Sequence, residues 1–186
     1  LPEDSQKIIV ENSSNYNFKT EIEKKYKNLR CYVMDTNLGY GKANNFGIKK
    51  SNTQYIFILN PDAQLFSNTI IDMINYLDKI KFAIAAPYSI NDFDENFFKG
   101  KSIVSQESVK GFAMLLNKKE MNDVGYFDEN FFIYLEEIDL CKRAIQNKKN
   151  IFLVKTTIDH KNGFSHGDRT DMEMEKSRNW HWMWSK

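Results

Sequence analysis

An apolar run that ends in a proline and an acid constrains the fold of this chain more than any other feature. Residues 55–59 are consecutive apolar side chains that favour β-structure, a pattern typical of a strand covered on both faces. Pro61 ends this strand because it cannot donate a ladder hydrogen bond, and Asp62 follows directly. In open α/β sheets, ligands bind at the carboxyl ends of buried strands. We therefore expect Asp62 to lie at a ligand site.

Strand-like and helix-like segments alternate through the first half of the chain. The predicted strands are 7–10, 31–34, 55–59 and 82–86, and the predicted helices are 15–29, 41–50 and a segment capped by Ser67 or Asn68. This alternation predicts βαβ units and a mostly parallel sheet flanked by helices. After a polar excursion at 88–108, we expect strands at 109–116 and 151–154, a helix at 136–146, and a loop from His160 onward.

Length and composition bound the class of protein. At 186 residues, 41% of them hydrophobic, the chain is expected to form one globular domain over residues 1–186. A formal net charge of +1 argues against a nucleic-acid binder that relies on bulk charge. Cys31 and Cys141 lie in apolar contexts, so we expect reduced core residues and a reducing compartment. No apolar run approaches the roughly 20 residues of a membrane span and no signal peptide is recognisable, so we expect a cytoplasmic protein.

Glu136, Glu137 and Asp139 form an acidic cluster where a helix is predicted to begin. Acids at this position suit the helix dipole and need no further role. The apolar run 131–135 precedes them directly, however, which indicates carboxylates at the lip of a pocket. Burial there would raise a carboxylate pKa toward the value that a general base needs. Taken alone, the residues leave both interpretations open.

Asp62 and two histidines have the chemistry of a metal site. Asp62 could coordinate Mg2+ or Mn2+ that holds diphosphate oxygens, or it could cap the next helix in an ordinary turn. His160 and His166 are spaced too widely for the short-spaced zinc patterns. Each histidine is then either a surface residue or a single ligand that completes a metal site held by carboxylates.

Gly39 and Gly41 flank the start of a predicted helix. Their spacing matches neither the dinucleotide fingerprint nor a P-loop. A helix N-terminus at this position, together with Lys42, could still receive a phosphate group.

Read together, five blocks resemble the family 2 glycosyltransferases, and within them the rhamnosyltransferase-like enzymes of bacterial cell-surface polysaccharide synthesis. The blocks are 37–47, 59–62, 125–129, 132–143 and His160. They occur in the family's order and cover about residues 8–166. The resemblance implies a GT-A (Rossmann-like) α/β fold, a nucleotide-sugar donor, a divalent cation (Mg2+ or Mn2+) and inversion at the anomeric carbon.

The resemblance also implies roles for single residues. Asp62 and His160 match metal ligands, Glu137 matches the catalytic base, which is usually Asp in the family, and Glu136 is its acidic neighbour. The residues expected to bind the donor are Glu11, Asn37, Lys42, Asn45, Asp62 and Gly111. The glutamates at 11 and 137 are each one methylene longer than the family's aspartate, which affects the nucleoside contact more than the base.

The chain departs from the family at its N-terminus. The family's first strand and first helix are missing before the strand at 7–10, and the chain ends within the aromatic run 180–184. We therefore expect a domain truncated at the N-terminus and at the C-terminus. The missing strand is interior to the family's sheet, so we expect either a gap in the core or another pairing, such as one with a second copy of the chain.

The mechanism expected from these residues is that of an inverting glycosyltransferase. Asp62 and His160 would hold the cation on the diphosphate, and Glu137 would deprotonate the hydroxyl of a glycan or lipid-linked acceptor. The competing interpretation is a non-catalytic module that binds a nucleotide or a glycan. A sugar-phosphate nucleotidyltransferase is disfavoured because no Gly-rich basic loop occurs near the start. The tryptophans in 180–184 could serve the core, a homo-oligomer, or peripheral association with the inner face of a bacterial membrane.

Overall fold

A computed structural model describes residues 5–92 and 94–160 of the chain. Its strands are β1 (Lys7–Glu11), β2 (Leu29–Val33), β3 (Tyr55–Leu59), β4 (Ala63–Leu65), β5 (Ile84–Ser89), β6 (Ile103–Ser105), β7 (Ala113–Asn117) and β8 (Ile151–His160). Its helices are α1 (Tyr16–Lys25), α2 (Tyr40–Lys50), α3 (Thr69–Tyr76), the 3-10 turn η1 (Ile90–Asp92), α4 (Glu95–Phe98), α5 (Lys118–Met121) and α6 (Glu136–Gln146). His166 and the aromatic run 180–184 lie outside the described residues.

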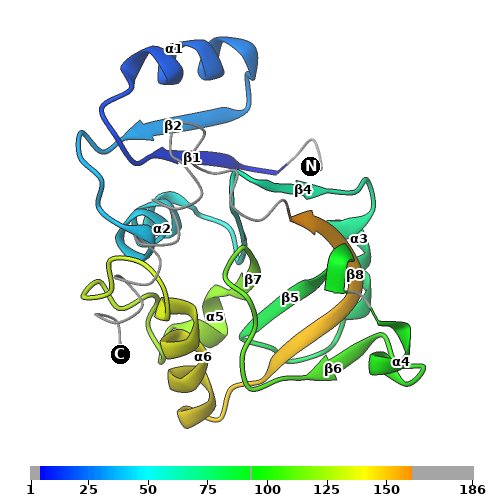
Figure 1. Ribbon diagram of the computed structural model, residues 1–186. Helices are drawn as coiled ribbons and strands as arrows, with labels where there is room; N and C mark the ends of the chain where they lie inside the picture. The colour runs from blue at the N-terminus through cyan, green and yellow to red at the C-terminus, as the bar shows by residue number, and fades with distance from the viewer. Residues whose placement is uncertain (1–4, 93, 161–186) are drawn as a thin grey trace, which may run out of the picture.

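The strands form two sheets, which Figure 1 shows one above the other. The smaller sheet pairs β1 with β2 in parallel, because the crossover through α1 returns the chain in the same direction. The larger sheet has the order β3-β7-β5-β8-β4, with β6 also paired to β8. In it β5 and β8 are parallel, and the pairs β3–β7, β5–β7, β4–β8 and β6–β8 are antiparallel. The predicted α/β architecture is confirmed, and its sheets contain both kinds of pairing.

The two sheets are not joined by strand pairing in the described part of the chain. Within residues 5–92 and 94–160, no strand of the β1–β2 sheet pairs with a strand of the larger sheet. Helix α2 spans the two layers instead. A Cβ on Gly47 would lie 3.2 Å from a methyl group of Val10 in β1, while Ile48 belongs to the main core with Ile58 of β3.

Helices cover both faces of the larger sheet. On one face, α2, α5 and α6 bury Ile48, Met121 and Leu140 against strand residues such as Met114. On the other face, α3 buries Met73 among a second cluster. Both cysteines are buried and free, as predicted. None of the described helices is long and apolar enough to cross a membrane.

The last strand is longer than the sequence predicts. We expected it to end at 154 and His160 to begin a loop, but β8 continues to His160. The prediction was wrong because Lys155 and Asp159 interrupt the apolar run. Their neighbours Thr156 and Ile158 are buried, so the strand continues with alternating burial. His160 is thereby fixed in the sheet opposite Ala63 of β4.

Helix α6 carries the acidic cluster in its first turn and packs against the core. This packing can be tested by truncating two of its side chains that are similar in size, Leu140 and Ile145. Leu140 is fully buried, whereas Ile145 on the same helix is 43% exposed. We expect Leu140→Ala to lower the free energy of unfolding by about 3 kcal/mol through a cavity, and Ile145→Ala by about 1 kcal/mol at most. Urea denaturation of both variants measures the difference. Equal losses would show that α6 does not pack as described.

Candidate active site

Asp62 and His160 meet at one end of the larger sheet. Asp62 directly precedes β4, and β4 pairs antiparallel with the end of β8, where Ala63 faces His160. This register brings Asp62 Oδ1 within 3.4 Å of His160 Nε2. The two side chains are 5% and 15% exposed, respectively. A buried carboxylate beside an imidazole offers one oxygen and one nitrogen ligand to a divalent cation.

Phe112, in the segment before β7, packs against this pair. The ring of Phe112 stacks on the His160 imidazole, with centroids 4.1 Å apart and an angle of 12° between the planes. The carbonyl oxygen of Phe112 accepts a hydrogen bond from the backbone N–H of Asn60 at 2.9 Å. Phe112 therefore contacts both the histidine and the turn that carries Asp62.

Glu136 and Glu137 open helix α6 in apolar surroundings. Tyr134 and Leu135, the two residues before the helix, both have positive φ angles of about 70°, an uncommon conformation for side chains of this size. Glu136 is 4% exposed, and its Oε2 accepts no hydrogen bond from the described residues. Burial, with a smaller contribution from the charge of Glu137, raises the pKa of Glu136 to about 7. Burial also raises the pKa of Glu137. Two of the three acids in the predicted cluster, Glu136 and Glu137, are thus desolvated, whereas Asp139 forms an ion pair with Arg143 at 2.8 Å.

Gly111 lies between the acidic pair and helix α2. A Cβ at this position would be 3.4 Å from Cβ of Glu137 and 3.6 Å from the hydroxyl oxygen of Tyr40. The Tyr40 hydroxyl donates a hydrogen bond to the carbonyl oxygen of Gly111 at 2.6 Å. Since Phe112 is the next residue, positions 111 and 112 connect the acidic pair to the Asp62–His160 pair.

Residues at the end of β1 and in the loop after β2 form a second group of predicted donor contacts. Glu11 Oε1 accepts a hydrogen bond from the hydroxyl of Ser13. Asn37 Oδ1 accepts hydrogen bonds from Nδ2 of Asn12 at 2.9 Å and from the backbone N–H of Gly39 at 3.0 Å. Asn12 also accepts from the N–H of residue 38 and so ties the end of β1 to this loop. Sequence reasoning missed Asn12, although an asparagine directly after a strand is typical of such side-chain-to-backbone turns.

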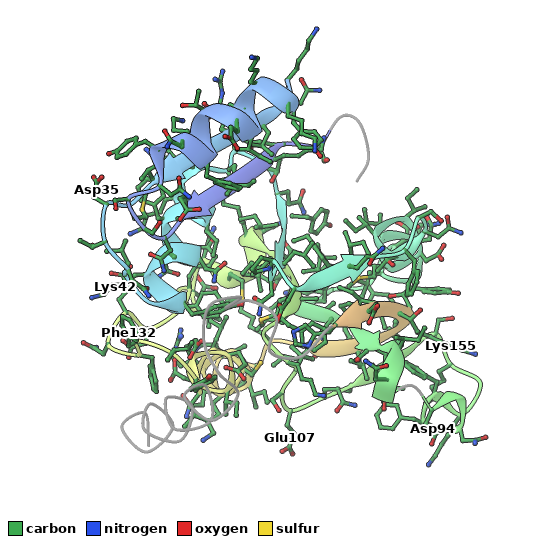
Figure 2. All side chains as sticks on the ribbon, turned by 45° about the horizontal axis from the view of Figure 1, so that its top comes forward. Asp35, Lys42, Asp94, Glu107, Phe132 and Lys155 are labelled. Carbon is green, nitrogen blue, oxygen red and sulfur yellow. The ribbon has the colours of Figure 1, made fainter. Side chains whose placement is uncertain are left out.

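The other two predicted donor residues lie on helix α2 in different settings. Asn45 is 6% exposed, and its amide bonds the carbonyl oxygen and the N–H of Phe127 as well as Glu129. Its described contacts therefore hold the 125–129 loop. Lys42 is exposed, and Figure 2 shows it on the outer side of α2, near Phe132.

The loop before α6 closes directly on the start of α2. The backbone N–H of Tyr40 donates to the carbonyl oxygen of Phe132 at 2.8 Å. Gly39, with a φ of 82°, caps α2 at the same place, and a Cβ there would lie only 2.3 Å from that oxygen. Position 39 therefore accepts glycine alone, because both its backbone angle and its contact exclude a side chain.

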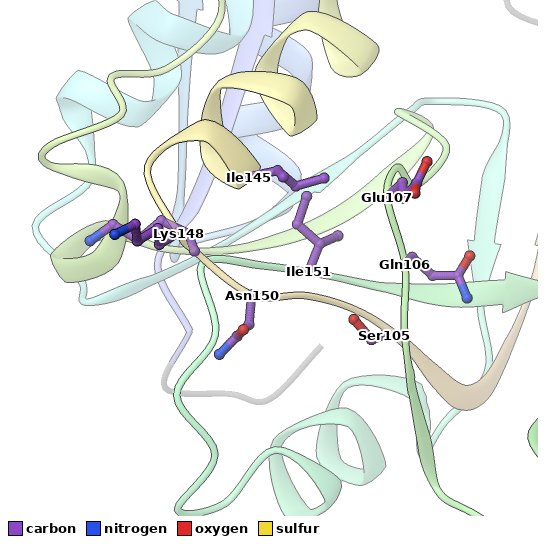
Figure 3. A pocket seen from close by; sticks show the side chains of 8 residues that line it. Ser105, Gln106, Glu107, Ile145, Lys148, Asn150 and Ile151 are labelled. Carbon is purple, nitrogen blue, oxygen red and sulfur yellow. The ribbon is translucent and has the colours of Figure 1, made fainter.

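A hollow of about 580 Å³ lies elsewhere on the molecule, at the opposite end of β8 (Figure 3). It is lined by Ser105, Gln106, Glu107, Ile145, Lys148, Lys149, Asn150 and Ile151. None of the residues predicted for the site lines this hollow.

The fold is that of the GT-A glycosyltransferases. The structure of GalNAc-T7 with UDP, GalNAc and Mn2+ superposes with a TM-score of 0.69 at 12% identity, over 82% of this chain and 37% of that one. This likeness confirms the predicted fold class. The chain belongs to glycosyl transferase family 2, whose model matches residues 2–142.

Two curated relatives are a hexosyltransferase and a rhamnosyltransferase by name. The low-salt glycan biosynthesis hexosyltransferase Agl10 of Haloferax volcanii is 24% identical over 171 residues, 77% of this chain and 54% of the relative. The rhamnosyltransferase WbbL of Escherichia coli K12 is 25% identical over 173 residues, 74% of this chain and 65% of the relative. The chain thus spans between about half and two thirds of the length of these relatives.

The raised pKa of Glu136 predicts a dependence of stability on pH. Between the ordinary glutamate value of 4.5 and about 7, the folded chain keeps a proton that the unfolded chain releases. This group therefore makes the free energy of unfolding fall as the pH rises through that window. Glu136→Gln has no carboxyl group to ionise at this position. Between pH 4 and pH 8, its free energy of unfolding should therefore rise relative to that of the wild type by up to about 3 kcal/mol.

Urea denaturation of both proteins across this pH range measures that gain. The exposed Glu21 gives the matched control, and Glu21→Gln should follow the wild-type curve. Wild-type and Glu136→Gln curves that run parallel from pH 4 to pH 8 would contradict the burial of this carboxylate.

Proposed function

We propose that the chain transfers a sugar from a nucleotide-diphosphate donor to a hydroxyl group of a cell-surface glycan or lipid-linked acceptor, with inversion at the anomeric carbon. The observation that carries the proposal is the arrangement around Gly111 and Phe112. Gly111 borders Glu137, and Phe112 stacks on His160 beside Asp62. A candidate base and a candidate metal site therefore adjoin one short segment.

The cation would be held by Asp62 and His160. Their carboxylate and imidazole are ligands that a divalent ion such as Mn2+ or Mg2+ accepts. Within the described residues they form a pair only, and no group of three or more acidic, histidine or cysteine side chains that could hold a metal occurs there or elsewhere. The presence of Mn2+ in the GalNAc-T7 structure supports this assignment. When bound, the ion would neutralise the charge that develops on the diphosphate leaving group.

Glu137 would act as the general base. Its pKa is raised by burial, which brings its basicity toward that needed to accept a hydroxyl proton near neutral pH. Glu136 keeps its proton up to about pH 7, so a negative charge on Glu137 meets little repulsion from its neighbour. The acceptor oxygen would then attack in line and displace the nucleoside diphosphate in a single step. This parallels inverting glycosidases, in which water is the nucleophile and displaces the leaving sugar oxygen.

The remaining donor contacts would come from the ends of the smaller sheet and from α2. Glu11, the last residue of β1, and Asn37, in the loop after β2, would contact the nucleoside. The exposed Lys42 would contact the diphosphate. Gly111 would let the backbone approach the sugar. Asn45 would support the donor site indirectly, because its side chain holds the loop at 125–129 by hydrogen bonds.

Donor binding can be tested by thermal shift with UDP, GDP and dTDP, each with and without Mn2+. A ligand that binds only the folded state raises the melting temperature, by an amount equivalent to about 2.7 kcal/mol at 100 times its Kd. We expect a Mn2+-dependent shift with one nucleotide, and its loss in Asp62→Asn. The control is Asp78→Asn, because the Asp78 side chain is 68% exposed. A shift that is identical in wild type and Asp62→Asn would contradict the metal assignment.

The role of Glu137 can be tested separately from donor binding. Glu137→Gln should keep the nucleotide shift and lower the transfer rate by about 10²- to 10⁴-fold, the range for loss of a general base. Glu107, in the distant hollow, is the control, and Glu107→Gln should transfer at the wild-type rate. Full activity of Glu137→Gln would overturn the base assignment. Wild type that binds nucleotide and Mn2+ but neither transfers nor hydrolyses any donor would favour a non-catalytic nucleotide-binding module.

A further inference from the structure

We propose that Tyr40 is a positioning residue that sets the spacing between Glu137 and the Asp62–His160 pair, acting through the backbone of residues 111 and 112. This inference rests on the proposed function in assigning a chemical role to that spacing. Tyr40 lies in the first turn of α2, outside the residues assigned to donor, metal or base. Its side chain reaches across to a segment far away in the sequence.

The first contact in this chain of interactions is a hydrogen bond. The Tyr40 hydroxyl donates to the carbonyl oxygen of Gly111 at 2.6 Å, which fixes this peptide against α2. The Tyr40 hydroxyl and the Glu137 side chain both lie beside Gly111. A Cβ at position 111 would lie 3.6 Å from the hydroxyl and 3.4 Å from Cβ of Glu137. The position of Gly111 therefore defines one wall against which Glu137 packs.

The second contact links the position of the Gly111 peptide to the proposed metal ligands. Phe112 follows Gly111 in the chain, and its ring stacks on His160 at 4.1 Å. Its carbonyl oxygen accepts from the N–H of Asn60, two residues before Asp62. A shift of the peptide at 111 would therefore move the ring that orients the imidazole and the turn that carries the carboxylate.

Tyr40 is itself held firmly enough to act as an anchor. Its backbone N–H donates to the carbonyl oxygen of Phe132, and its ring packs edge-on against Phe127, with centroids 5.6 Å apart. Phe127 is in turn bonded at both its N–H and its carbonyl oxygen by Asn45. Burial and the charges of the nearby glutamates raise the pKa of the Tyr40 hydroxyl, so it keeps its proton and stays a donor.

Tyr40→Phe removes the hydroxyl and keeps the ring, and Tyr126→Phe is the matched control because Tyr126 packs against the same core. We expect Tyr40→Phe to lower kcat about ten-fold, because sub-ångström misplacement of catalytic groups has effects of this order. The KM for the donor should change less than kcat, since the described hydrogen bonds and ring contact of the Tyr40 side chain go to Gly111 and Phe127, and not to Glu11 or Asn37. Tyr126→Phe should leave kcat unchanged.

A second measurement does not depend on transfer. The ring current of Phe112 displaces the NMR signals of the stacked His160 imidazole, which can be assigned with His160→Gln. Phe112→Leu gives the position of these signals without stacking. We expect Tyr40→Phe to move the His160 signals toward that position, and Tyr126→Phe to leave them in place.

The two measurements separate failure of this inference from failure of the proposed function. A His160 signal unmoved in folded Tyr40→Phe, or a kcat equal to wild type, overturns the positioning role. Wild type that transfers no sugar overturns the proposed function, while the NMR comparison still decides whether Tyr40 controls the placement of His160. If Tyr40→Phe does not fold, Phe112→Leu takes its place, and an unchanged kcat in that variant overturns the coupling through residues 111 and 112.

Discussion

The burial of two adjacent carboxylates at the start of α6 is the constraint on which the rest of the site depends. Removing a carboxylate from water without a full set of hydrogen bonds costs free energy, and Glu136 is nearly inaccessible to solvent. The following turns on the same face of the helix offset this cost, because Leu140, Cys141 and Ala144 are completely buried in the main core. One helix thus combines a strongly stabilising face with a destabilising first turn, and neighbouring loops must close tightly to keep water out. Positive φ angles at two bulky residues before the helix are a further sign of that closure.

Strand pairing places the other two candidate residues, Asp62 and His160. The register of β4 with β8 brings Asp62 to His160, although the two are far apart in the chain. The antiparallel β7 lies between β3 and β5 and begins at Ala113, so Gly111 and Phe112 emerge at the same end of the sheet as Asp62. In an all-parallel sheet, a strand at this position would start at the opposite end. The antiparallel strand is therefore what places residues 111 and 112 between the acidic pair and the histidine.

Local sequence patterns predicted the parts of the fold that local forces determine. The strand at 55–59 and the helix at 136–146 agree with the structure at both ends, because an apolar run before a proline and a stripe of apolar side chains specify them. The prediction that this strand is covered on both faces was wrong, since β3 lies at the edge of the larger sheet with Tyr55 and Leu59 exposed. The acidic cluster was also recognised. The extension of β8 to His160 was not, since it depends on long-range pairing with β4, β5 and β6. Asn12 and Tyr40 escaped notice for the same reason: their partners are distant in sequence, and an ordinary asparagine or tyrosine carries no local signature of its partner.

The separation of the two sheets has a consequence for how the molecule responds to its ligands. A two-stranded sheet is barely stable alone, and α1 contributes no fully buried side chain to β1 and β2. In the described part of the chain, helix α2 packs on both this layer and the core of the larger sheet. We therefore expect the layer to have a lower local opening free energy than the main core. A ligand that touches both layers would add a second tie between them. Binding of such a ligand would then make thermal unfolding more cooperative. The β1–β2 layer would unfold together with the larger sheet instead of before it.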